Sequence, residues 1–375
     1  MTFGSLFYTI KQRLIRLLQS INRSTPYLDS LKDLFGLKDA IYKILFKEAN
    51  GRETQCIIKT LDNGIIARKI KNLQQEGITD IAFYVLCVQN MGDVIASEPI
   101  SRHLKKITPK ANVHWIIKGA FKEIVEYNPN IDSVLVVNSL WEGFVLGKLK
   151  ESKPGNILIN CHFDGQYCHQ TGKTISNPNN PTITDRTYYN VGTLLEAFSC
   201  SAGLHMLHDA PIFHLDKTRN FKAITSSRYI VLHCHSTDSN RDWNDKNWNR
   251  IAGLILSMGI HLIEIGVVKS IDSSNLFYHD YSGRRSLQDI AFLIKNATLF
   301  IGIDSGFGHI ANCFKIESVI LMGRYSCFPR YFPYNGEFSH SSQMHIIRAP
   351  YGEFASAIPY DTVSETLKPI LESLA

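Results

Sequence analysis

Two Rossmann-like, doubly wound α/β domains that face a cleft are predicted by three features of this 375-residue sequence. Strand-length apolar runs alternate with helix-length segments from residue 80 onward, which is typical of parallel sheets built from crossover units. This alternation stops at the polar, irregular stretch His214–Ser227 and then begins again. We therefore expect an N-terminal extension over residues 1–78, a first domain over residues 79–215 and a second over residues 216–375 that ends in a helix.

In the first domain the apolar runs are continuous, as expected for strands that are covered on both faces. The expected strands are Ile81–Val88, Val113–Ile117, Ser133–Val137 and Asn156–Asn160. The expected helices are a segment that ends near Lys106, Phe121–Tyr127, Leu140–Leu149 and Val191–Ala202. Residues 165–182 are rich in Gly, Asn, Pro and Thr and are predicted to form a long surface loop, a kind of segment that is often functional.

The second domain repeats the pattern. Its expected strands are Tyr229–His233, His261–Gly266, Thr298–Ile303 and Ser318–Met322. Its expected helices are Trp248–Met258, Ser286–Lys295, Gly308–Phe314 and Thr362–Leu374. In such sheets ligands bind beyond the carboxyl ends of the strands.

The composition excludes several classes of protein. A hydrophobic fraction of 44% and a charged fraction of 20% indicate a globular chain. No apolar run is long enough to predict a membrane-spanning helix, and no signal peptide is recognisable at the N-terminus. The eight cysteines lie at irregular spacings, which favours a cytoplasmic protein with free thiols.

All of the net charge lies near the N-terminus. Residues 1–78 hold 13 Lys and Arg against 7 Asp and Glu, whereas the rest of the chain holds 27 of each. Residues 1–20 place apolar side chains from Phe3 to Leu18 at helical spacing, with Lys11, Arg13 and Arg16 on the other face. This pattern predicts peripheral contact with an acidic membrane surface, and we expect no nucleic-acid partner. The alternatives are that the basic charge belongs to a solvated helical face, or that residues 1–20 form a helix that packs on the protein's own body.

The strongest candidate site follows the predicted strand that ends at Ile303. Asp304 stands at the strand end, and Ser305 and Gly306 open the next helix, whose free N–H groups favour an anion. Gly306 and Gly308 would let a phosphate approach the backbone, and His309 could donate to a phosphate oxygen. The alternative is that Asp304 and Ser305 are a simple helix cap.

A second candidate follows the first strand of the second domain. The hydroxyls of Ser236 and Thr237 and the guanidinium of Arg241 could hold a diphosphate. Trp243 and Trp248 are expected to pack this loop against the body. The alternative is a polar loop whose charge is incidental.

A third candidate, Asn90, Met91, Gly92 and Asp93, follows the first strand of the first domain. Asp93 could take a proton from a hydroxyl group. The alternative is that Asp93 caps the following helix.

These three elements together resemble glycosyltransferase family 9, the heptosyltransferase family. The residues that carry the resemblance are Met91-Gly92-Asp93-Val94, Ser236-Thr237 with Arg241 and Trp243, Asp304-Ser305-Gly306 with His309, and Ser286–Ala291 through Gly323. The resemblance covers roughly residues 80–350. It implies a GT-B fold, an inverting transfer of heptose from ADP-heptose, and a lipopolysaccharide-core or related glycan or glycolipid acceptor, with no further cofactor.

The resemblance also implies roles for individual residues. Asp93 corresponds to the general base, on the acceptor side with Asn90, Met91 and Gly92. The donor-binding residues would be Ser236, Thr237, Arg241, Asp304, Ser305, Gly306, Gly308 and His309. Arg241 stands where lysine is common in the family. The loop Gly266-Val267-Val268-Lys269 lacks the acidic residue that some members use near the donor ribose.

Two functions other than glycosyl transfer would fit the same architecture. A nucleotide-sugar epimerase on this fold would turn over its nucleotide-sugar without an acceptor, and a non-catalytic nucleotide-sugar-binding protein would bind donor without turnover. A metal enzyme is not expected, because Cys161-His162, Cys168-His169 and His233-Cys234-His235 match no common zinc spacing.

Overall fold

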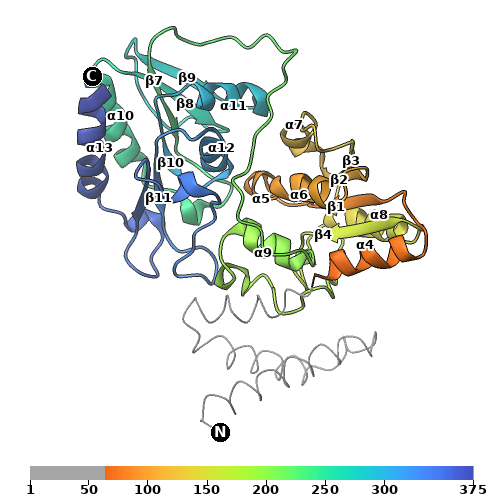
Figure 1. Ribbon diagram of the computed structural model, residues 1–375. Helices are drawn as coiled ribbons and strands as arrows, with labels where there is room; N and C mark the ends of the chain where they lie inside the picture. The colour runs from red at the N-terminus through yellow and green to blue at the C-terminus, as the bar shows by residue number, and fades with distance from the viewer. Residues whose placement is uncertain (1–63, 375) are drawn as a thin grey trace.

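The computed structural model describes residues 64–374. Figure 1 shows two α/β domains side by side, the first formed by the N-terminal half of the described residues and the second by the C-terminal half. The predicted amphipathic segment at residues 1–20 lies outside the described residues. Between residues 64 and 374 no helix is long and apolar enough to cross a membrane.

The first domain contains a four-stranded parallel sheet of order β3-β2-β1-β4. Its strands are β1 (Ala82–Leu86), β2 (Asn112–Lys118), β3 (Ser133–Val137) and β4 (Asn156–Asn160). Its helices are α4 (Ile65–Gln75), α5 (Met91–Ala96), α6 (Pro99–Ile107), α7 (Lys122–Val125), α8 (Leu140–Glu151) and α9 (Leu194–Ser201). The predicted long loop after β4 carries a small antiparallel hairpin, β5 (Tyr167–Cys168) and β6 (Lys173–Thr174).

The second domain contains a six-stranded parallel sheet of order β12-β11-β10-β7-β8-β9. Its strands are β7 (Tyr229–His233), β8 (His261–Gly266), β9 (Tyr278–Ser282), β10 (Leu299–Ile303), β11 (Ser318–Met322) and β12 (Met344–Arg348). Its helices are α10 (Asp245–Ser257), α11 (Leu287–Lys295), α12 (Gly306–Phe314) and α13 (Tyr360–Leu374). This order is that of a complete Rossmann sheet, and the first domain has the order of its first four strands.

The sequence prediction missed the strands β9 and β12, which lie at the two edges of the second sheet. Their side chains are mostly half-buried or exposed, unlike those of the central strand β10, which are all buried. An edge strand needs fewer apolar residues, so it leaves no continuous apolar run to detect.

The N-terminal boundary of the first domain also differs from the prediction. Helix α4 falls within the range expected to be an extension, yet Ile66 and Ile70 are buried in the same core as the first sheet. The Ile66 N–H also donates to the Gly203 carbonyl at 3.2 Å. The first domain therefore begins by residue 65, because the apolar face of α4 is covered by the domain.

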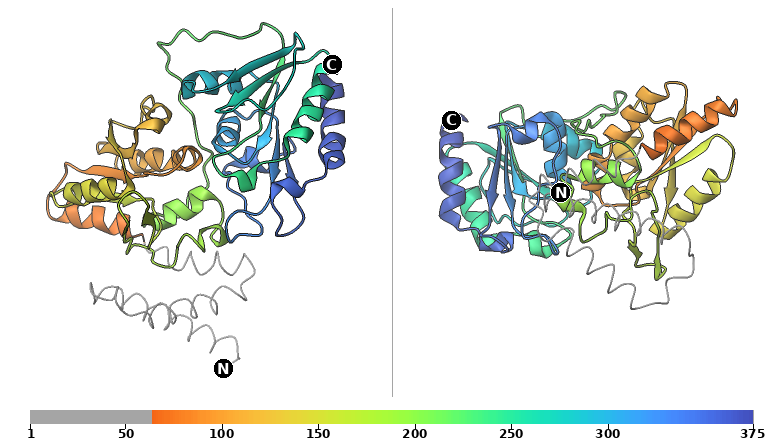
Figure 2. Two further views of the ribbon diagram at one scale, coloured as in Figure 1. Left: turned by 180° about the vertical axis from the view of Figure 1, so that it is seen from behind. Right: turned by 60° about the horizontal axis from the view of Figure 1, so that its bottom comes forward.

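The two domains contact each other through helices at the carboxyl ends of their strands. Helix α5 packs against α12, and α7 packs against α11 (Figure 1). Helices α10 and α13 lie on the outer face of the second sheet, away from the first domain (Figure 2). The connecting segment is held by the first domain at Ile212, whose N–H donates to Glu98, and by the second at Asp216, whose N–H donates to Gln288.

Candidate functional site

The three predicted site segments follow β1, β7 and β10. Strands β7 and β10 are neighbours at the point where the strand order of the second sheet reverses, and β1 has the equivalent position in the first sheet beside β4. Loops diverge at such a point and leave room for a ligand. Contact between α5 and α12 brings the segments after β1 and β10 together.

Asp93 lies in the first turn of α5, three residues after the N-cap residue Asn90. Its Oδ2 accepts a hydrogen bond from the Asn90 N–H at 3.1 Å, so the expected alternative of a capping role is present in part. Burial raises the pKa of the Asp93 carboxyl to about 6, although the Asn90 N–H and the positive charge of Arg241 act in the opposite direction. The Arg241 contribution places Asp93 within electrostatic range of the second domain.

Asp304 ends β10 and is almost completely buried. Its Oδ2 accepts a hydrogen bond from the Tyr331 hydroxyl at 2.6 Å, and its Oδ1 accepts one from the Tyr334 hydroxyl at 3.0 Å. Arg241 Nη1 lies 3.4 Å from Asp304 Oδ2. The carboxylate is thus surrounded by protein donors, and its direct partners are side chains of the second domain.

Arg241 lies at the end of a short 3-10 helix, Ser239–Arg241, in the loop after β7. Its guanidinium stacks over the Tyr325 ring at 4.6 Å from the centroid. Its Nε is buried and has no hydrogen-bond partner among the described residues, although Asp238 Oδ2 lies 4.0 Å away. A buried guanidinium N–H without a partner can donate to an anionic ligand without first breaking a protein hydrogen bond.

Ser236 and Thr237 differ in their surroundings. The Ser236 hydroxyl donates to the Asp238 carbonyl at 2.6 Å and accepts from the Asp238 N–H at 3.0 Å, so it shapes the loop. Thr237 is exposed at the turn of the same loop. Trp243 and Trp248 are buried in the core of the second domain, as the sequence predicted.

Ser305 is the N-cap residue of α12, but its side chain makes no capping hydrogen bond. Its Oγ is buried without a partner among the described residues. Ser305 thus has the N-cap position of the expected alternative, but neither its side chain nor that of Asp304 makes a capping hydrogen bond, because Asp304 bonds to tyrosines and the Ser305 hydroxyl is unused. That hydroxyl and the first N–H groups of α12 remain as donors at the helix start.

Two glycines of this site, Gly92 and Gly306, allow the two domains to approach closely, and Gly308 allows close packing within the second domain. A Cβ atom on Gly306 would lie 2.2 Å from Met91 Cε, and one on Gly308 would lie 2.6 Å from the Tyr334 hydroxyl. A Cβ on Gly92 would lie 3.0 Å from Cδ2 of His309. The structure thus gives these glycines, together with Met91, a packing role that the sequence prediction did not include.

His309 is buried against Gly92 and Tyr334, whose ring lies 4.6 Å away. Burial lowers the pKa of its imidazole to about 4, so the ring is neutral near pH 7. Its Nδ1 has no hydrogen-bond partner among the described residues. A neutral imidazole can donate only one N–H, so His309 would bind an anion as a dipole and not as a charge.

Sequence reasoning missed a cluster of aromatic residues around these groups. Tyr188 and Tyr189 of the first domain contact Phe328 of the second at 5.0 and 5.2 Å between ring centroids. Tyr189 also lies 4.9 Å from Tyr331, one of the two hydroxyl donors to Asp304. These rings come from loops without regular periodicity, and only the count of five aromatic residues in residues 325–334 could have drawn attention to them.

The acidic residue of β8 that is nearest to the following loop is turned inward. Glu264 is completely buried, and its carboxylate accepts from the N–H groups of Ser270 and Ile271 at 2.6 and 3.2 Å. The following Val267 is 73% exposed. The Glu264 carboxylate therefore binds the backbone of the loop that follows β8, and it does not supply the acidic group that this loop lacks.

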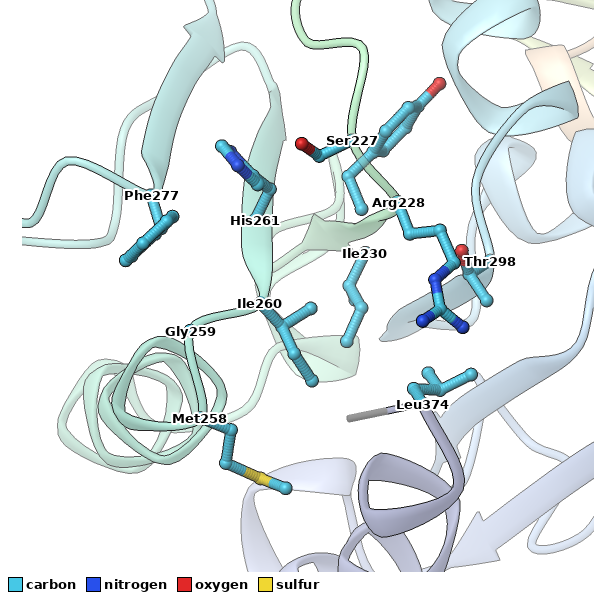
Figure 3. Close-up of a pocket in the computed structure, with 11 residues that line it drawn as sticks. Ser227, Arg228, Ile230, Met258, Gly259, Ile260, His261, Phe277, Thr298 and Leu374 are labelled. Atoms are coloured by element: carbon cyan, nitrogen blue, oxygen red, sulfur yellow. The ribbon is translucent and has the colours of Figure 1, made fainter.

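Two other features lie apart from this site. Within residues 64–374 no cluster of three or more His, Cys, Asp or Glu side chains could hold a metal ion, and the cysteines there are free. A cavity of about 280 Å³ lies at the amino ends of β7 and β8, lined by Arg228, His261 and Leu374 among others (Figure 3). It is at the end of the sheet opposite the predicted site, so we do not assign the donor to it.

Comparison with known proteins identifies a family whose model matches part of this chain. Residues 184–342 match the model of glycosyltransferase family 9 (heptosyltransferase). This region includes β7, β10 and β11, the Arg241 loop and the start of α12. The resemblance expected from the sequence is confirmed, and the match supports a glycosyltransferase enzyme.

Solved structures confirm the GT-B-type fold. A glycosyltransferase family 9 protein from Veillonella parvula is 16% identical, with a TM-score of 0.57 over 78% of this chain and 98% of its own. Escherichia coli ADP-heptose lps heptosyltransferase II is 15% identical, with a TM-score of 0.55 over 78% and 99%. E. coli heptosyltransferase WaaC with ADP-2-deoxy-2-fluoro heptose is 15% identical, with a TM-score of 0.54 over 77% and 100%. No curated protein matches the sequence.

Proposed function

We propose that this protein transfers heptose from ADP-heptose to a hydroxyl group of a lipopolysaccharide-core or related glycan, with inversion at the anomeric carbon. The observation that carries the proposal is the packing of α5, which holds Asp93 of the first domain, against α12 of the second, with Arg241 close enough to lower the pKa of Asp93. The solved structures of similar fold include one with ADP-2-deoxy-2-fluoro heptose, which favours a donor of this kind.

Asp93 is the general base of the proposed reaction. A carboxyl whose pKa is about 6 is ionised near pH 7 and binds a proton more strongly than an ordinary aspartate. It removes the proton of the acceptor hydroxyl as that oxygen forms a bond to the anomeric carbon. The bond between the anomeric carbon and the diphosphate oxygen breaks on the opposite face, and its electron pair leaves with the nucleoside diphosphate.

The second domain stabilises the leaving diphosphate. The unused Nε of Arg241, the unused hydroxyl of Ser305 and the N–H groups at the start of α12 are donors for its oxygens. Thr237 and His309 add neutral donors. No metal or further cofactor takes part in this proposal, because the charge is balanced by Arg241 and by the helix start.

We assign Asp304 a positioning role in place of direct donor binding. Its carboxylate is buried and bonded to Tyr331 and Tyr334, and Arg241 lies beside it. The negative charge of Asp304 would repel a diphosphate that contacted it directly. The same carboxylate, held in place by the two tyrosines, can orient the Arg241 guanidinium toward the diphosphate.

The proposal is tested by incubating the protein with ADP-heptose, with and without a lipid-free lipopolysaccharide core oligosaccharide, and measuring ADP release and the mass of the glycan. We expect ADP release that depends on the glycan, and a glycan mass increased by one heptose. Conversion of the sugar nucleotide without glycan would favour an epimerase. Binding without release of ADP in either arm would favour a non-catalytic binding protein.

A further inference from the structure

A pair of glutamine amides lies at the carboxyl ends of β1 and β4, where the chain leads from β1 into α5, the helix that carries the proposed base. Gln89 follows β1 and directly precedes Asn90, whose N–H donates to Asp93. Gln166 lies after β4 and opens the hairpin β5–β6. The two side chains bond reciprocally, from Gln166 Nε2 to Gln89 Oε1 at 3.2 Å and from Gln89 Nε2 to Gln166 Oε1 at 3.3 Å.

A buried histidine fixes the orientation of this amide pair. His162 is completely buried, and its Nε2 accepts a hydrogen bond from the Val88 N–H at 2.9 Å. The neutral ring must therefore carry its proton on Nδ1, which donates to Gln166 Oε1 at 2.8 Å. Burial lowers the pKa of His162 to about 4, so this arrangement persists at neutral pH.

The fixed orientation leaves polar atoms free. Each amide uses one N–H in the reciprocal pair, and the second N–H of each has no protein partner among the described residues. Gln89 Oε1 accepts one hydrogen bond and has capacity for another. Both side chains are half-buried, so a ligand can reach them. The pair offers donors and an acceptor at fixed positions, which suits vicinal hydroxyl groups that both donate and accept.

An exposed aromatic residue is the next residue in the sequence after Gln166. Tyr167 follows Gln166 directly and is 51% exposed, and its ring is contacted edge-on by His169 at 5.0 Å between centroids. The next residue, Cys168, is buried in the core cluster with Leu86 and Val88, which anchors the hairpin to the end of the first sheet. An aromatic residue on an anchored hairpin, next in sequence to one of the fixed amides, can supply the apolar contact that a sugar ring requires in addition to hydrogen bonds.

We propose that Gln89, Gln166 and Tyr167 form a subsite for the acceptor glycan, in which the amide pair binds hydroxyl groups of the acceptor sugar and Tyr167 packs against the neighbouring sugar. The inference rests on the proposed function, because it supplies the acceptor for Asp93. It makes His162 a positioning residue, which acts through Gln166. The ligand is a neutral polyhydroxylated sugar surface, since the subsite residues carry no charge.

The test uses the full chain saturated with ADP and a lipid-free lipopolysaccharide core oligosaccharide as probe. In nitrogen-15 NMR spectra we expect the side-chain amide signals of Gln89 and Gln166, assigned by their loss in the alanine variants, to shift on addition of the probe. Absence of these shifts overturns the proposal.

Variants add a quantitative arm. Gln166→Glu keeps the oxygen that accepts from His162 but removes the amide donors, and Gln89→Ala removes the second amide. We expect each of these changes, and Tyr167→Ala, to raise the KM for the probe by about tenfold or more. We expect kcat to change less than KM, and the affinity for ADP to be unchanged. The exposed Gln75 on α4 supplies the control Gln75→Ala, which should leave KM unchanged.

Equal KM values in wild type and the subsite variants would overturn the inference while leaving the proposed function intact. Failure of the wild type to bind ADP and to release it from ADP-heptose would instead refute the proposed function. An equal rise in KM for Gln75→Ala would also overturn the inference, because the effect would then not depend on the amide pair.

Discussion

Replacement of Asp93 by asparagine should strongly reduce transfer yet stabilise the fold at neutral and alkaline pH. The pKa of this carboxyl is raised from an ordinary 3.8 to about 6 in the folded protein. Below pH 3.8 the carboxyl is neutral in the folded and unfolded states, so the ionisation penalty is absent. As the pH rises, the unfolded chain loses its proton first, and the penalty grows until it is complete above about pH 6.

The size of the effect follows from the two pKa values. Their difference corresponds to about 3 kcal/mol in full, of which about 1.4 kcal/mol develops between pH 5 and pH 8. Solvent reaches the partly exposed side chain and screens its charge, so we expect about 1 kcal/mol over this range. The free energy of unfolding of Asp93→Asn, relative to that of the wild type, should therefore be about 1 kcal/mol higher at pH 8 than at pH 5.

The assay is urea unfolding followed by circular dichroism at both pH values, with the exposed Asp272→Asn as the control. The control and the wild type should differ by the same amount at pH 5 and pH 8. In parallel, kcat/KM of the wild type should rise with pH through about 6, and transfer by Asp93→Asn should fall by about a hundredfold or more. A stability difference that stays constant or shrinks from pH 5 to pH 8 would refute the argument that burial raises this pKa. Near-wild-type turnover by the variant would remove Asp93 from the mechanism.

The remaining predictions concern the donor site, the domain contact and the N-terminal segment. Arg241→Ala should weaken ADP binding about ten- to a hundredfold in calorimetry, and His309→Ala should weaken it less because its imidazole is neutral; unchanged affinity for both would place the diphosphate elsewhere. Gly306→Ala should lower the free energy of unfolding by about 1–3 kcal/mol, because the added Cβ would clash with Met91. The control Gly253→Ala in α10, where a Cβ meets nothing, should not lower it. Equal melting temperatures for both variants would contradict the close packing of α5 on α12. Deletion of residues 1–20 should remove salt-sensitive sedimentation with anionic liposomes and leave the melting temperature unchanged; a large fall in melting temperature would support packing on the body instead.

The sequence by itself determined the fold class and the positions of the central strands. Tyr229–His233 and Ser318–Met322 were predicted to the residue, because strands that are covered on both faces are predominantly apolar. The same reasoning located Asp93, Arg241 and the Ser305 helix start, because loops that follow such strands converge at one edge of a sheet. Local sequence was sufficient here, since each inference depended on a single strand and the loop after it.

Only the tertiary structure decided how these residues are used. The hydroxyls that hold Asp304 come from Tyr331 and Tyr334, about thirty residues away, and no local pattern connects them to it. Gly306 could be explained from the sequence by a phosphate, but the structure places Met91 of the other domain against it. The raised pKa of Asp93 likewise depends on burial between the domains. Such effects depend on distance in space, and sequence periodicity carries information only about the faces of one element at a time.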